Sequence, residues 1–144
     1  MSLTRDEFLA IDDITIKEIT VPENIPIWGG KSLFIKQLNR GQQTAYQKRI
    51  SGTALLHQNG KKQDVSGLAL YGHEAWLCIQ ACCNEDGTPM FSMKDEEALN
   101  RKSGEALGWI SVEIIKFSGM AQDAKVASGE ITPEEALAEE IKNS

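Results

Sequence analysis

Residues 20–38, TVPENIPIWGGKSLFIKQL, predict the end of one β-strand, a loop and a second β-strand. The first strand is expected over residues 14–22, ITIKEITVP, because this stretch is rich in β-branched side chains and ends at Pro22. The second strand is expected over residues 31–38. The loop PENIPIWGG contains two prolines and two glycines, so it is longer than a tight hairpin turn but still lets the strands pair.

A short helix is expected before the first strand. Thr4 is a suitable N-cap residue, and Glu7 stands at the capping-box position three residues later. The helix carries three apolar residues, Phe8, Leu9 and Ile11.

The middle of the chain changes to helical spacing. Residues 39–56 predict a helix with a polar outer face, which Gly52 could interrupt. Residues 57–67 predict a polar loop or a short hairpin with Asn-Gly at its tip. Residues 68–83, LALYGHEAWLCIQACC, are apolar on nearly every side, which is typical of a central buried helix.

Further helices are expected after a turn at residues 84–89. Ser92, with Asp95 three residues later, opens one of them. Residues 103–120 predict a core helix, because their apolar residues lie along one stripe. Strands followed by helices predict an α+β fold, with a small antiparallel N-terminal β-sheet, a mainly helical body and a C-terminal helix.

The sequence predicts a single α+β domain over residues 1–120 and an acidic helical tail over residues 121–144, flexible or partner-binding. Thr132 is a strong N-cap, because a proline and two acidic residues follow it. A narrow apolar seam in the tail is the predicted partner-binding or self-association contact: Ile131, Leu137 and Ile141. Packing of this helix on its own domain is the alternative.

Composition narrows the classes of function. The chain has 144 residues and a net charge of −6, which predicts no nucleic-acid partner, because phosphate binding depends on clustered Lys and Arg. It contains no apolar run of the length that spans a membrane, and its N-terminus does not have the pattern of a signal peptide. Three cysteines within six residues favour a reducing cytoplasm over a disulfide framework.

The stretch WGGKS at residues 28–32 resembles the end of a phosphate-binding loop. Such a loop needs a glycine six residues before its lysine, and Ile25 stands six residues before Lys31. It also leads into a helix, whereas Lys31 leads into an expected strand. We therefore interpret the glycines as turn residues.

No catalytic, cofactor or metal site is predicted. His73 and the three cysteines could suggest zinc, but His73 lies off the helix face shared by Cys78 and Cys82, and no second ligand pair completes a site. Free cysteines are common core residues. The two histidines lie in no recognisable nucleophile motif.

Two short motifs and one helix together resemble a known family. The first motif is Pro22-Glu23, then an insertion over residues 24–27, then Trp28-Gly29-Gly30; the second is the turn DGTPMF, residues 86–91, with Asp86, Gly87, Pro89 and Phe91. The helix reads GEALGWISVEII. In this order they resemble the tail assembly chaperones of long, non-contractile-tailed bacteriophages and their prophages. The resemblance covers roughly residues 3–118, and the insertion is a departure from the family pattern.

The resemblance implies a non-enzymatic protein in the host cytoplasm. It would bind the tape-measure protein, keep it soluble and help to recruit tail-tube subunits. A minor tail or connector subunit that stays in the virion is the alternative. An enzyme that uses His73 or the cysteines is a third hypothesis.

Overall fold

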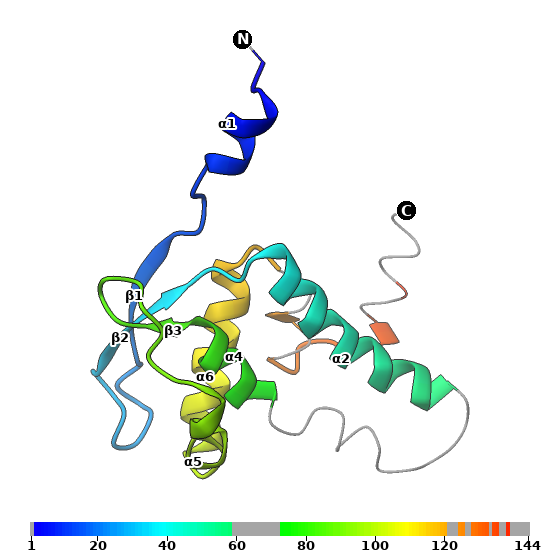
Figure 1. The fold of residues 1–144 in the computed structure, drawn as a ribbon. Helices are drawn as coiled ribbons and strands as arrows, with labels where there is room; N and C mark the ends of the chain where they lie inside the picture. The colour runs from blue at the N-terminus through cyan, green and yellow to red at the C-terminus, as the bar shows by residue number, and fades with distance from the viewer. Residues whose placement is uncertain are drawn as a thin grey trace.

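The computed structural model describes residues 2–58, 73–120, 124–125, 128–132, 134–135 and 138. It has the predicted α+β fold, with a small antiparallel sheet followed by helices (Figure 1). The N-terminal helix α1 (Arg5–Ala10) has the predicted capping box between Thr4 and Glu7.

The predicted hairpin of two strands is confirmed. Strand β1 (Ile16–Thr20) pairs antiparallel with β2 (Ser32–Lys36). Strand β1 forms one edge of a sheet of order β1-β2-β3, in which β3 is Cys82–Cys83. Ile19 of β1 and Ile35 of β2 are buried, so this face of the hairpin lies on the helices.

The prediction of one helix over residues 68–83 is wrong at its C-terminal end. Helix α4 (His73–Ala81) stops at Ala81, and Cys82–Cys83 form the short strand β3, paired with Ile35 and Phe34 of β2. A short apolar run can be a buried strand or part of a buried helix, and its period does not distinguish them. Residues 68–72 lie outside the described residues, as do 59–67 of the predicted loop or hairpin.

Helix α2 (Arg40–Gln58) passes through Gly52, so the interruption that the sequence allowed is absent there. Its start is capped reciprocally: the Gln42 backbone N–H donates to Asn39 Oδ1, and the Asn39 N–H donates to Gln42 Oε1, both at 2.9 Å.

The predicted helix at Ser92 begins as one turn of 3₁₀-helix, Met93–Asp95, with the expected capping box, and continues as α5 (Glu96–Asn100). Helix α6 (Gly104–Phe117) confirms the predicted core helix and packs on α4. In the predicted tail, the Glu135 N–H donates to Thr132 Oγ1 at 3.1 Å, which is the predicted N-cap contact.

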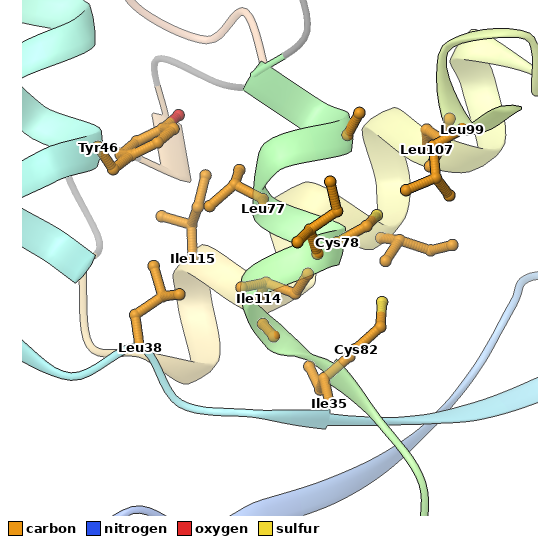
Figure 2. Close-up of a cluster of buried hydrophobic side chains, with 14 of the residues drawn as sticks. Ile35, Leu38, Tyr46, Leu77, Cys78, Cys82, Leu99, Leu107, Ile114 and Ile115 are labelled. Atoms are coloured by element: carbon orange, nitrogen blue, oxygen red, sulfur yellow. The ribbon is translucent and has the colours of Figure 1, made fainter. Parts of the chain in front are cut away.

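The core lies between the sheet, α4, α6 and the start of α2 (Figure 2). Figure 2 shows Leu77 and Cys78 of α4 in the same buried cluster as Ile114 and Ile115 of α6, with Tyr46 of α2 at one side. A second, smaller cluster unites the hairpin loop with α6: Val21, Ile25 and Ala106.

Candidate interaction surface

The loop between β1 and β2 is closed by backbone hydrogen bonds. The Val21 N–H donates to the Lys31 carbonyl at 2.8 Å, and the Gly30 N–H donates to the Val21 carbonyl at 2.9 Å. Inside this closure, the Gly29 N–H donates to the Ile25 carbonyl at 2.9 Å. The loop is therefore a defined turn that leads into a strand, as the sequence predicts for WGGKS.

The position of Glu23 explains why residues 29 and 30 of this loop are glycines. A Cβ on Gly29 would lie 2.7 Å from the Glu23 carbonyl oxygen, and a Cβ on Gly30 would lie 2.8 Å from Glu23 Oε1. Gly30 also has a φ of 80°, a backbone conformation that residues with a Cβ rarely adopt. Trp28 is half-buried and packs against both hydrophobic clusters, so it fixes the loop to the body of the protein.

The second motif forms a compact turn after β3. Asp86 Oδ1 accepts hydrogen bonds from the hydroxyl of Thr88 at 2.6 Å and from its backbone N–H at 3.0 Å. These bonds, that of the hydroxyl first, hold the pKa of Asp86 below its usual value. Gly87 has a φ of 89° and lies against Ile16 of β1. A Cβ on Gly87 would lie 3.0 Å from Ile16 Cδ1.

The other motif residues lie near the sheet. Pro89 bridges to Cys83 of β3, and Phe91 is half-buried against the main core. The motif residues from the two segments thus support the same small sheet: Trp28, Gly29, Gly30, Asp86, Gly87, Pro89 and Phe91. They are placed to shape the fold, and most of them have little side chain available for a ligand.

The segment before Ile19 carries several exposed apolar side chains. Within the described residues, none before Ile19 is buried, and Figure 1 shows α1 standing away from the rest of the protein. Phe8 is 66% exposed and Leu9 is 63% exposed. We define the N-terminal apolar surface as six exposed side chains: Leu3, Phe8, Leu9, Ile11, Ile14 and Ile16.

The sequence analysis did not select these residues as a contact. The signal was present, because Phe8, Leu9 and Ile11 lie close together in a stretch that also contains several charged residues. The sequence alone does not show whether another element covers these side chains. The described part of the structure shows that they remain open to solvent, and exposed apolar patches mark interaction sites.

The residues predicted to bind a partner through the tail are only partly described. Ile131 is half-buried. Leu137 and Ile141 lie outside the described residues, so the apolar seam of the tail stays a prediction.

The three cysteines are core residues, as predicted, and all are free thiols. A hydrogen bond with the Cys78 thiol and burial strongly raise the pKa of Cys82, and burial raises the pKa of Cys83 against the opposing charge of Lys36. Protonated, buried thiols are poor nucleophiles and poor metal ligands. Among the described residues, no group of three His, Cys, Asp or Glu side chains could hold a metal ion.

No protein-family model, curated protein or solved structure matches this chain. None of the helices in the described ranges is long and apolar enough to cross a membrane. The N-terminal apolar surface is therefore the structural feature from which we argue the function.

Proposed function

We propose that this protein is a non-enzymatic tail assembly chaperone of a long, non-contractile-tailed phage or prophage. It binds the tape-measure protein, keeps it soluble and helps to recruit tail-tube subunits. The observation that carries the proposal is the N-terminal apolar surface, which lies beside a fold whose two motifs resemble that family.

An amphipathic client helix is a suitable partner for this surface. A long helical protein exposes apolar stripes before assembly, and such stripes aggregate unless another apolar surface covers them. The capping box of Thr4 and Glu7 forms α1 before the client arrives, which lowers the ordering cost of binding.

The size of the surface suits reversible binding. Fully burying one Leu, Ile or Phe side chain contributes about 1.5–3 kcal/mol. A few such side chains offset the loss of translational freedom but leave a moderate net affinity. A chaperone that leaves before the tail is complete needs this combination.

Acidic side chains border the apolar surface. Asp6, Glu7, Asp12 and Asp13 are exposed in the same segment as Phe8. In a chain of net charge −6 they favour encounter with a basic client and disfavour nucleic acid. Added salt should therefore slow association with a basic client, while the apolar contact persists.

The proposal is tested by co-expressing a tagged form of this chain with the tape-measure protein encoded beside it, and measuring how much co-purifies. The double variant Phe8→Ser with Leu9→Ser should lose most of the complex, whereas Met90→Ser, an exposed apolar residue after β3, should retain it. Equal recovery with all three forms would contradict a role for the surface. Presence of the chain in purified virions would favour the structural-subunit alternative.

A further inference from the structure

Ile27 has a backbone conformation that isoleucine rarely adopts. Within the described part of the chain it is the one non-glycine residue with a positive φ, 72°. A β-branched side chain in this left-handed region is a genuine outlier, because Cβ crowds the backbone. The same side chain is 90% exposed, so it is the most exposed of the large hydrophobic residues that the structure describes.

The surrounding loop imposes this conformation. Ile25, two residues before, is 4% exposed in the small cluster, and Trp28, one residue after, packs on both clusters. The Lys31 N–H donates to the Trp28 carbonyl at 3.1 Å, and the loop is closed at Val21. The packing of Ile25 and Trp28 therefore holds the Ile27 side chain in the solvent, and Ile27 itself contributes little buried area.

Strain of this kind persists when the neighbouring structure determines it, and it gathers at functional positions. Asn or Gly would satisfy a positive φ with less strain. An exposed isoleucine at this point thus lowers stability without filling the core, which points to a use outside the chain's own fold.

We propose that Ile27 is the anchor residue of a second client contact, in which its side chain enters a hole between side chains of a helix in the tape-measure protein. This inference rests on the proposed function. Exposed polar and charged residues precede and follow Ile27 in the same loop: Glu23, Asn24 and Lys31. An apolar centre within a polar rim is the usual arrangement of a protein interface.

The position of the loop suits an elongated client. The N-terminal apolar surface ends at Ile16, the first residue of β1, and the Ile27 loop follows β1, so the two lie toward opposite ends of the hairpin (Figure 1). At about 3.3 Å per residue, an extended segment from Ile14 to Val21, which contains β1, spans roughly 23 Å. A client helix that touched both would need on the order of 15 residues, at 1.5 Å each.

The hollow beside α5 of a second copy of this chain is a poor match for the anchor. The surface hollow beside α5 is lined by Met93, Lys94, Glu96, Glu97, Asn100 and Arg101. This lining is mainly charged or polar and offers no apolar hole for a branched aliphatic side chain. A long helix with apolar residues at repeated positions presents such holes along its length.

The test measures stability and binding on the same variants. Ile27→Asn removes the strain and the apolar anchor, whereas Ile27→Leu keeps an apolar side chain without the β-branch. Met93→Asn is the matched control, because Met93 is another exposed apolar residue, 56% exposed and distant in sequence. Thermal unfolding is followed on each purified full-length chain, and affinity is measured by titration against the tape-measure protein held soluble as a fusion.

We expect Ile27→Asn to raise Tm by about 3 °C, because strain relief near 1 kcal/mol shifts a domain of this size by a few degrees. The same variant should bind the client at least about ten-fold more weakly, as loss of a hot-spot residue does. Ile27→Leu should bind within about three-fold of the unchanged protein. Met93→Asn should bind as the unchanged protein does.

Five outcomes overturn the inference. Unchanged client binding by Ile27→Asn, with binding still lost on Phe8→Ser with Leu9→Ser, would remove the second contact and leave the proposed function. A fall in Tm on Ile27→Asn would show that the side chain serves the fold. A loss of client binding in Met93→Asn equal to that in Ile27→Asn would show that the effect is not specific to Ile27. Self-association that depends on Ile27, together with unchanged client binding, would assign the anchor to a second copy. No binding by the unchanged protein would contradict both proposals.

Discussion

Glu23 and Gly29 approach so closely that no side chain fits between them. A Cβ on Gly29 would lie 2.7 Å from the carbonyl oxygen of Glu23 and 2.9 Å from its Cα. These are backbone atoms, so they cannot move aside as the end of a flexible side chain can. This contact makes the first motif a structural unit, in which Pro22-Glu23 and Trp28-Gly29-Gly30 support each other across the inserted residues.

Gly29→Ala should therefore destabilise the protein. We expect a loss of about 1–3 kcal/mol in the free energy of unfolding, because the loop must shift to admit the methyl group. Gly108 in α6 is the matched control, since a Cβ there meets nothing within 4 Å. Gly108→Ala should stabilise by up to about 1 kcal/mol through helix propensity. Urea unfolding of both variants checks this, and a neutral Gly29→Ala would contradict the account of the loop.

Ser118 joins the end of α6 to the residues after β2. Its Oγ accepts from the Leu38 N–H at 2.9 Å and donates to the Ile114 carbonyl at 2.7 Å. Ser118→Ala leaves a half-buried N–H without this acceptor and should cost about 1–3 kcal/mol of unfolding free energy. Ser128→Ala is the control, because the Ser128 hydroxyl donates on the exposed surface. Equal Tm values for the two variants would show that the junction does not contribute.

Asp86 should make stability depend on acid pH. Its pKa is lowered by the bonds from Thr88, so the native state favours the carboxylate. The contribution of this carboxylate to stability is fully present above the pKa of the unfolded state, about 3.9. It is lost as the pH falls through the lower pKa of the native state. Asp86→Asn keeps the shape and removes the titration.

The measurement is thermal unfolding between pH 6 and pH 2, with Asp12→Asn as the control in the exposed N-terminal segment. The gap in Tm between the unchanged protein and Asp86→Asn should shrink as the pH falls below about 4. The unchanged protein and Asp12→Asn should keep a nearly constant gap. A gap at Asp86 that does not depend on pH would mean that its charge does not stabilise the turn.

The three thiols should resist modification in the native state. Cys78, Cys82 and Cys83 are each at most 1% exposed, and burial raises the pKa of the last two. Alkylation requires an accessible thiolate. Treatment with iodoacetamide followed by mass spectrometry should label none of them until denaturant is added. Rapid labelling of the native protein would contradict their place in the core and restore the hypothesis of a reactive cysteine.

The sequence predicted the elements that depend on local patterns. The hairpin followed from β-branched residues between turn residues, and the helix starts at Thr4 and Ser92 followed from capping boxes. It did not predict β3, because two residues carry no period and their partner Ile35 is distant in the chain. A strand of this length exists only through its long-range pairing.

The candidate surface was harder to predict than the fold. Whether Phe8 or Ile27 is covered depends on which elements pack over it, and a single sequence does not show this. The sequence predicts that the glycines of the loop are turn residues, and Gly30 has a positive φ. Ile27 also has a positive φ because Ile25 and Trp28 are packed on the body of the protein, which is a tertiary effect.

The most direct test of the proposed chaperone function is the solubility of a tape-measure protein from the same genome, expressed with this chain and without it in the same cells. We predict that this chain moves most of the tape-measure protein into the soluble fraction, and that Phe8→Ser with Leu9→Ser does so much less. A tape-measure protein that stays equally insoluble with and without this chain would contradict the account.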